Sequence, residues 1–339
     1  MGNNRYICNM TAEEINEIPR LRIEGMELNK TLEQINKKME SLINELNRYC
    51  YEYYNTGKSV VSDTVYDWKL AELESLEKES GITMANSPTG RVGYTVVDGL
   101  LKAEHTEPLL SLEKEKSINK AQEFISKNDV LLSIKLDGLT VELIYEEGSL
   151  VRASTRGDGW TGEDITHNAK AIMGIPLQIP YKKSLIVIGE AYINHLNFEI
   201  VKRQYADAGE DIPGNSRNLA AGSVRSYDCA KCAERKVCFT AFTGKFMEED
   251  FERKQNSLHR LRILGFDVVP FLELSKTVSK DTLTSCLTVL RSYDKTYPID
   301  GIVITYDNIE FSKSCGNTSK YYKDGIAFKF EDDFHETTL

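Results

Sequence analysis

Long apolar segments are missing from the sequence. No stretch approaches the roughly 18 consecutive apolar residues that a membrane-spanning helix needs, and the polar N-terminal run 1–14 lacks the apolar centre of a signal peptide. We therefore expect a cytoplasmic protein that makes no contact with a membrane. With 41% hydrophobic residues among 339, the chain can bury one large core or two modest cores.

A disulfide framework is also missing. The seven cysteines are an odd number in a long chain, which is typical of reduced thiols in an intracellular protein. Cys229 and Cys232 form a CxxC pair with Cys238 nearby, but a structural zinc site needs four ligands and no second pair follows. We expect ordinary small side chains here rather than a metal site.

An excess of positive charge is absent as well. The formal net charge is −10, whereas proteins that hold nucleic acid through bulk electrostatics carry clustered lysine and arginine. If DNA is the substrate, local basic patches or a further module must hold it.

Apolar residues at helical spacing predict two helices near the N-terminus. An apolar stripe over 31–54 indicates an amphipathic helix. A second helix is expected to begin near Ser62 or Asp63 and to stop at Gly81. We predict a small helical domain over 31–95, preceded by an extension of unknown role over 1–30. The proline and glycine residues of 87–107 indicate a connection between domains.

From Asp129 onward the pattern changes to strands mixed with helices, which predicts an α+β domain over 96–339. A hairpin turn is expected at Glu147 and Gly148. We expect strands at 130–136, 140–145, 150–155, 185–193, 237–242, 268–272, 301–306 and 326–330, and helices at 195–207, 249–264 and 280–293.

The segment Ser-Ile-Lys-Leu-Asp-Gly at 133–138 alternates polar and apolar residues. Ser133, Lys135 and Asp137 should therefore share one face of a strand, while Ile134 and Leu136 pack into the core. A lysine attacks phosphorus only as the free amine, which burial or neighbouring positive charge favours. Alone, the tetrapeptide KLDG at 135–138 favours the simpler interpretation of an exposed lysine on an edge strand.

Several longer motifs follow in a fixed order. They are RGDG at 156–159, TGEDIT at 161–166, GE at 189–190, RNLAAGSVR at 217–225, IDGIVI at 299–304 and AFKF at 327–330. Together with KLDG at 135–138 they resemble the NAD-dependent DNA ligases, from about residue 31 to the C-terminus. The resemblance implies an ATP-grasp-like nucleotidyltransferase domain with antiparallel sheets, of the DNA ligase and mRNA capping superfamily.

The helical domain points to NAD rather than ATP. Its tyrosines and aspartates are similar to those of the domain that binds the nicotinamide mononucleotide half of NAD in these ligases, and ATP-using ligases and capping enzymes lack that domain. Core packing is the alternative role for Tyr53 and Tyr66. The residues matched in this domain and in the linker after it are Tyr53, Tyr54, Asp63, Tyr66, Asp67, Ser111 and Leu112.

The resemblance also implies roles in the larger domain. Lys135 would take AMP from NAD, and Asp137 and Glu190 would hold ribose hydroxyls or Mg²⁺, a hard cation that carboxylates suit. Phe242 would stack on adenine or pack in the core. Phosphate contacts are expected from Arg156, Arg217, Arg225 and Lys329. The predicted catalytic set is Lys135, Asp137, Arg156, Glu190 and Lys329, and Ser133, Asp300 and Thr305 complete the nucleotide site.

Two residues depart from the family pattern. Ser133 stands where the family has a glutamate, and Thr305 stands where it has a lysine at the phosphate. The region before the last motif, where the family has a tryptophan, is also changed. Loss of one charged donor costs on the order of a hundredfold to a thousandfold in rate, so we expect weakened adenylation. Lys320 or Lys323 could replace the missing cation or could simply face solvent.

The chain stops at Leu339, about where the family passes into an oligonucleotide-binding barrel, a zinc finger, helix-hairpin-helix repeats and a BRCT domain. We expect these domains to be absent, nicked double-stranded DNA to bind weakly, and a monomer that adenylates itself as the first step of nick sealing. One alternative is a weakened NAD- or AMP-binding accessory protein of DNA repair. Another is an ATP-using ligase or capping-type transferase.

Overall fold

The computed structural model of the chain describes residues 32–49, 61–89 and 99–330. The chain divides after Ser80 into two compact units, which are taken one at a time below. Among the described residues, none of the helices combines the length and the apolar character that a membrane span requires.

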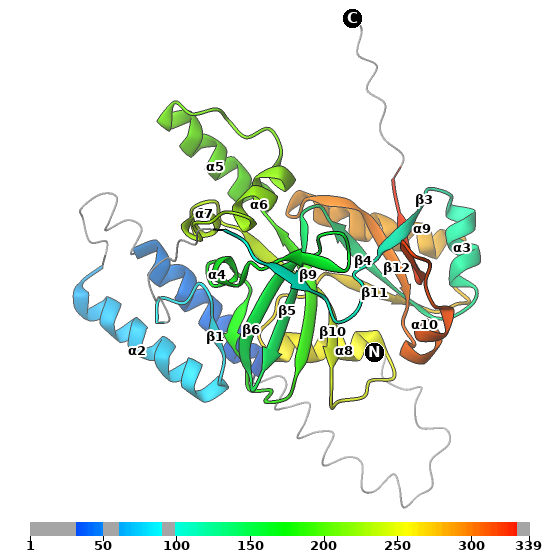
Figure 1. Ribbon diagram of the computed structural model, residues 1–339, viewed down its shortest axis with the longest axis horizontal. Helices are drawn as coiled ribbons and strands as arrows, with labels where there is room; N and C mark the ends of the chain where they lie inside the picture. The colour runs from blue at the N-terminus through cyan, green and yellow to red at the C-terminus, as the bar shows by residue number, and fades with distance from the viewer. Residues whose placement is uncertain (1–31, 50–60, 90–98, 331–339) are drawn as a thin grey trace, which may run out of the picture. The chain divides into compact units, whose positions relative to one another are not determined.

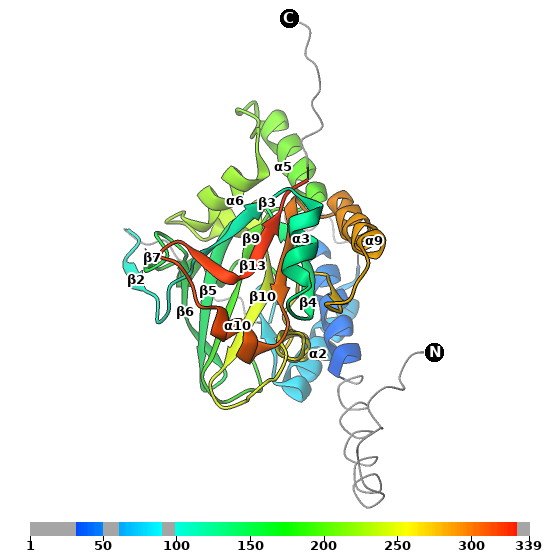
Figure 2. The same ribbon diagram turned by 90° about the vertical axis from the view of Figure 1, so that its right-hand side faces the viewer.

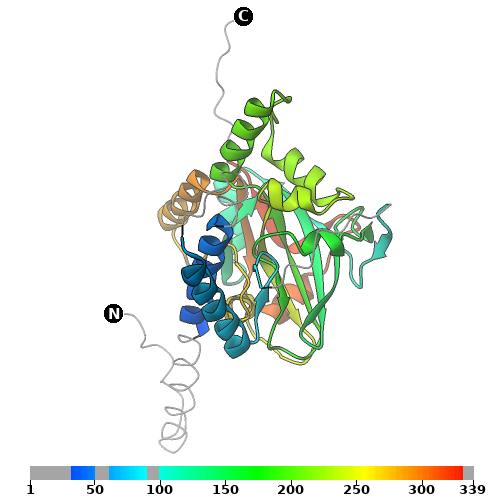
Figure 3. The ribbon, with the colours of Figure 1, turned by 90° about the vertical axis from the view of Figure 1, so that its left-hand side faces the viewer.

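The described part of the first unit, 32–49 and 61–80, forms a pair of helices (Figure 3). The helix over 32–49 and α2 (Asp63–Ser80) are joined by the ion pairs Lys38–Glu72 at 2.6 Å and Lys69–Glu45 at 2.8 Å, an order that makes the helices antiparallel. The predicted helical hairpin is confirmed, although 50–54 lies outside the described residues. Side chains three and four apart form its core, namely Met39, Leu42, Ile43, Leu46 and Leu73.

The second unit is built on two larger sheets and one small one (Figure 1). The six-stranded sheet has the order β1 (Thr83–Met84), β8 (Pro176–Gln178), β6 (Ser149–Thr155), β5 (Leu139–Glu146), β9 (Leu185–Tyr192) and β10 (Cys238–Phe246). The five-stranded sheet has the order β11 (Phe271–Leu274), β4 (Val130–Leu136), β12 (Ile299–Tyr306), β13 (Tyr321–Phe328) and β3 (Ser111–Glu115). The small sheet pairs β2 (Lys102–Glu104) with β7 (Thr161–Glu163).

These sheets are antiparallel except where β13 pairs with β3 in parallel. The mixture of antiparallel sheets and helices confirms the α+β fold class. The remaining helices are α3 (Ile118–Ile125), α4 (Thr166–Ala169), α5 (His195–Ala208), α6 (Ser216–Val224), α7 (Ala230–Glu234), α8 (Lys254–Ile263), α9 (Lys280–Arg291), the 3-10 helix η1 (Ser292–Lys295) and α10 (Ile309–Cys315).

Each larger sheet buries one face under helices. Helices α3 and α9 lie side by side on the five-stranded sheet (Figure 2), where Ile125 and Leu287 pack against Ile134 and Ile304. Helices α6 and α8 pack on the six-stranded sheet and contribute side chains such as Val224 and Leu261 to its core. Because side chains alternate along a strand, the opposite faces carry other residues, and on the six-stranded sheet these include Ile186 and Ile188, which are buried against Leu109.

Several predicted boundaries are wrong by a few residues. The strand expected at 268–272 is Phe271–Leu274, because Val268 forms only an isolated bridge with Ala241 of β10, to which the amide of Val269 also donates. The helix expected at 249–264 begins at Lys254, and the last strand is Tyr321–Phe328 rather than 326–330. The connection over 87–107 contains the short strand β2.

Candidate active site

Lys135 lies on the open face of the five-stranded sheet. In β4 the side chains of Ile134 and Leu136 are buried, while Ser133 and Lys135 are partly exposed on the other face, as the alternation predicts. Lys135 pairs with Gly301 of β12. Its Nζ lies 3.4 Å from Oδ2 of Asp300, so the lysine is held beside a carboxylate instead of extending into solvent.

Asp300 binds two lysines at once. Oδ1 of Asp300 forms an ion pair with Nζ of Lys329, and that Nζ also donates to the backbone oxygen of Asp300 at 2.9 Å. Burial favours the neutral acid, but the hydrogen bond from Lys329 and the charge of Lys135 outweigh it and lower the pKa of Asp300. Asp300 is therefore ionised and fixes the spacing of the two cations.

Glu190 brings the second sheet into the site. It lies in β9 on the face opposite the helices, where its Oε2 accepts a hydrogen bond from Oγ1 of Thr140 at 3.0 Å. Burial raises the pKa of Glu190 to about 7, while the charges of Lys135, Arg217 and Arg156 and the Thr140 hydrogen bond oppose that rise. The carboxyl group thus titrates near neutral pH within the field of the predicted cations.

The predicted arginines reach this face from two elements. Nη1 of Arg217 in α6 lies 2.8 Å from Oδ1 of Asp137, and Nε of Arg225 lies 2.8 Å from Oε2 of Glu163. Nη1 of Arg156, just after β6, donates to Oγ of Ser111 at 3.5 Å. Asn215 caps the N-terminus of α6 through the amide of Asn218, which fixes the start of the helix and so places Arg217 in its first turn.

The two departures from the family pattern lie on the same face as Lys135. Ser133 pairs with Val303, and Thr305 pairs with Leu131 on one side and Gly325 on the other. A Cβ atom on Gly325 would lie 2.7 Å from Cγ2 of Thr305, so the threonine methyl group lies directly over this glycine.

Of the two lysines considered as substitutes, Lys320 immediately precedes β13 and Lys323 lies within that strand. Nζ of Lys320 lies 5.2 Å from the centre of the Tyr321 ring, and Lys323 is exposed. Their substitution for the missing cation stays a prediction.

The other predicted contacts are more scattered. Phe242, beside a bulge in β10, is 38% exposed and is therefore not an interior core residue. Ser111 and Leu112 begin β3, where the amide of Ser111 donates to the oxygen of Lys320. In the first unit, Tyr66 is partly buried and Asp67 exposed on α2. Asp63 begins that helix, and Tyr53 and Tyr54 lie outside the described residues.

No three acidic, histidine or cysteine side chains gather into a metal-binding cluster anywhere in 32–49, 61–89 or 99–330. Cys229 and Cys232 are buried, and burial raises the pKa of Cys232 to about 12. The Cys232 side chain is therefore a protonated thiol at neutral pH.

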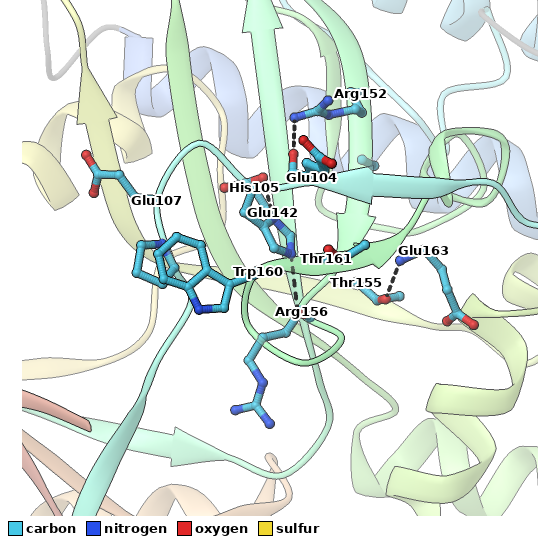
Figure 4. Close-up of polar contacts among 12 residues, drawn as sticks. Glu104, His105, Glu107, Glu142, Arg152, Thr155, Arg156, Trp160, Thr161 and Glu163 are labelled. Carbon is cyan, nitrogen blue, oxygen red and sulfur yellow. Dashed lines mark hydrogen bonds and ion pairs between the residues drawn. The ribbon is translucent and has the colours of Figure 1, made fainter. Parts of the chain in front are cut away.

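Sequence reasoning missed a buried ionisable pair behind Arg156. His105 and Glu142 are 0% and 3% exposed, and Nδ1 of His105 lies 2.8 Å from Oε1 of Glu142 (Figure 4). The sequence feature that could have indicated this pair is Glu142, an acidic residue between the apolar residues of β5.

Comparison with known proteins identifies the family of the chain. The family model described as the NAD-dependent DNA ligase adenylation domain matches residues 98–333, and the DNA ligase-like N-terminal NAD⁺-binding domain matches residues 32–93. The chain belongs to the family of NAD-dependent DNA ligase adenylation domains.

Curated relatives are longer than this chain. A DNA ligase of Ruminiclostridium cellulolyticum is 38% identical over 305 residues, which are 89% of this chain and 46% of the relative. A DNA ligase of Lachnoclostridium phytofermentans is 39% identical over 291 residues, covering 85% and 44%. The chain therefore spans about half the length of the curated relatives that it matches.

Proposed function

We propose that the chain transfers AMP from NAD to Nζ of Lys135 and releases nicotinamide mononucleotide, the first step in sealing a DNA nick. The observation that carries the proposal is the position of Lys135, which lies beside ionised Asp300 and within the field of Glu190. Family membership favours NAD as the donor of AMP.

The proposed step exchanges one bond at the α-phosphorus for another. The amine of Lys135 forms a bond to phosphorus, the bond to the bridging oxygen breaks, and nicotinamide mononucleotide leaves with that oxygen. Lys135 loses its ammonium proton to solvent before the attack, since only the free amine is a nucleophile, and the nitrogen releases a second proton to solvent as the bond to phosphorus forms. Because phosphoryl transfer depends mainly on positioning and on neutralising developing charge, Arg156, Arg217, Arg225 and Lys329 would contact the phosphates.

Each sheet would contribute a different part of the site. Lys135, Asp300 and Lys329 come from the five-stranded sheet, and Glu190 comes from the six-stranded sheet. Phe242 would stack on adenine, and Ser133 and Thr305 would line the nucleotide site. In the helical unit, Tyr53, Tyr54, Asp63, Tyr66 and Asp67 would bind the mononucleotide half, with Ser111 and Leu112 contributing from the linker.

Asp137 and Glu190 would hold Mg²⁺. Their carboxylate oxygens are the ligands this hard cation prefers, and a cation would favour the charged form of Glu190, which burial disfavours. The ion would supply positive charge at the phosphates. Asp137 is already paired with Arg217, so this pair would have to share the carboxylate with the ion.

Nicked double-stranded DNA would be the final acceptor of AMP. The net charge of −10 opposes attraction to a polyanion, so the affinity of this chain for DNA would rest on local cations. Self-adenylation is consequently the activity by which to test the proposal.

The test is intact-protein mass spectrometry after incubation with Mg²⁺ and either NAD or ATP. We expect one added AMP with NAD alone, its loss in Lys135→Ala, and its retention in Lys183→Ala, an exposed lysine paired with Glu248. Folded protein that binds NAD but gains no AMP would refute the transfer, and an adduct with ATP alone would refute the choice of donor.

A further inference from the structure

The buried pair formed by His105 and Glu142 lies directly behind the turn that carries Arg156 (Figure 4). His105 follows β2, and Glu142 lies in the middle of β5, on the same face of the sheet as Thr140. Nδ1 of His105 contacts Oε1 of Glu142 at 2.8 Å, and Nε2 lies 3.2 Å from the backbone oxygen of Arg156. Both nitrogens of the ring are therefore engaged.

The carbonyl partner of Nε2 determines that this nitrogen is protonated. A backbone carbonyl only accepts hydrogen bonds, so Nε2 of His105 must carry a hydrogen and donate to Arg156. A second proton lies between Nδ1 and Glu142. Burial favours neutral imidazole, but the hydrogen bond and charge of Glu142 and the carbonyls of Arg156 and Thr155 outweigh it and raise the pKa of His105.

His105 holds the turn at both ends. Its ring binds the oxygen of Arg156, while its backbone amide donates to the oxygen of Trp160 at 2.9 Å. Inside the turn, Oδ1 of Asp158 accepts from the amides of Trp160 and Thr161 at 2.9 and 2.8 Å. One histidine thus connects the first and last residues of a turn that is already closed by its own aspartate.

The side chain of Arg156 extends away from His105 (Figure 4). Its guanidinium group contacts Ser111, and its charge acts on Glu190 in the site. His105 is too deeply buried to touch a nucleotide, so any influence on the reaction must pass through the backbone of Arg156.

We propose that His105, held by Glu142, is a positioning residue that aims Arg156 at the phosphates of the bound nucleotide. This inference rests on the proposed function, because Arg156 is assigned to phosphate only there. A displacement of about 1 Å in a charged contact can cost a hundredfold in rate. Loss of the histidine should therefore slow adduct formation at saturating NAD more than it raises the NAD concentration needed for half-maximal rate.

The test is a double-mutant cycle of single-turnover adduct formation. His105→Phe keeps an aromatic ring but removes the side-chain contacts to Glu142 and Arg156. We expect about a tenfold to hundredfold slower reaction. His105→Gln, which retains one donor, should recover part of the rate. In an Arg156→Ala background the same His105 substitutions should cost nothing further, because the group they act through is gone.

A merely structural histidine would give another result, in which His105→Phe slows Arg156→Ala protein as much as it slows the wild type. That outcome, or an unchanged rate in His105→Phe, overturns the proposal. If His105→Phe does not fold, the cycle is run with His105→Gln.

Amide hydrogen exchange over 156–161 supplies a readout that needs no activity. Exchange should be at least about tenfold faster in His105→Phe, since opening of the turn no longer breaks the bond to Arg156. Wild-type protein without an AMP adduct would refute the proposed function alone. Unchanged exchange would refute the positioning role whether or not the adduct forms.

Discussion

Ser133 and Thr305 occupy related positions on the sheet. Ser133 pairs with Val303, and Thr305 lies two residues further along β12 on the same face. The two are therefore diagonal neighbours, close enough for long side chains to interact. In the family pattern these positions hold a glutamate and a lysine, so the two departures remove an acid and a base together. The net charge of this face is therefore the same as with the glutamate and the lysine of the family pattern.

Restoring the lysine alone should accelerate adenylation. Thr305→Lys places a cation on the face of Lys135, and Gly325 leaves space beside it. We expect about a tenfold to hundredfold faster adduct formation because one charged donor at the phosphate contributes on that scale. The measurement is a time course of intact mass with NAD. Thr305→Met, of similar length without charge, is the control, and equal rates in the two variants would exclude a role for charge at 305.

At this scale the sequence predicted which face of β4 carries Lys135, but it did not predict the contacts of the site. Ordered motifs singled out Lys135, Glu190 and Arg217 by resemblance, and alternation in β4 correctly placed Lys135 opposite the core. The ion pair of Arg217 with Asp137 joins residues 80 positions apart. No local pattern encodes such a pairing, because it depends on how α6 and β4 meet.

Among the elements, strands with clear alternation or long apolar runs were predicted almost to the residue, as for β4 and β6. Short elements were missed. β3 is five residues long and its burial does not alternate, and α3 has only two turns. Their positions depend on tertiary pairing, since β3 joins its sheet through β13, more than 200 residues later.

Replacing glycine by alanine should have opposite effects on the free energy of unfolding at two positions, Gly301 and Gly222. Gly301 in β12 has a φ of +153°, and an added Cβ would overlap the carbonyl oxygen of Phe328 in β13. Gly301→Ala should cost at least about 2 kcal/mol, because backbone cannot move aside as a side chain can. Gly222, exposed in α6 with open space around it, is the matched site.

Gly222→Ala should stabilise the protein by roughly 0.5–1 kcal/mol, through helix propensity. Urea unfolding followed by circular dichroism measures both changes. Equal effects of the two substitutions would contradict the close approach of β12 and β13.

On the scale of the whole molecule, the carboxyl groups of Glu190 and Asp300 change the stability of the fold in opposite directions as pH rises. The pKa of Glu190 is raised to about 7, so its contribution to stability is complete below pH 4.5 and is lost as pH rises through 7. The pKa of Asp300 is lowered, so its contribution is present above its ordinary value and is lost as pH falls. His105, with a raised pKa, adds to the loss at higher pH.

Glu190→Gln should remove most of the decline in unfolding free energy between pH 5 and pH 8.5. The expected difference from the wild type is about 3 kcal/mol at the upper end, because the pKa of Glu190 rises from its ordinary 4.5 to about 7. Urea unfolding at several pH values measures it. Glu146→Gln, on an exposed strand end, should leave the profile unchanged. A wild-type profile that is flat across this range would mean that Glu190 is ionised in the folded protein.

The two tryptophans of the chain fall one to each unit. Trp68 in α2 is 63% exposed, and Trp160, in the turn held by His105, is 60% exposed. Each unit therefore has its own fluorophore. Because indole emission depends on contact with water, a ligand that covers either tryptophan changes that emission. Trp68→Phe leaves a signal from the Arg156 turn alone, and Trp160→Phe leaves one from the helical unit. Under the proposed function, occupancy of the two halves of NAD would then be followed separately, through emission from the protein's own tryptophans.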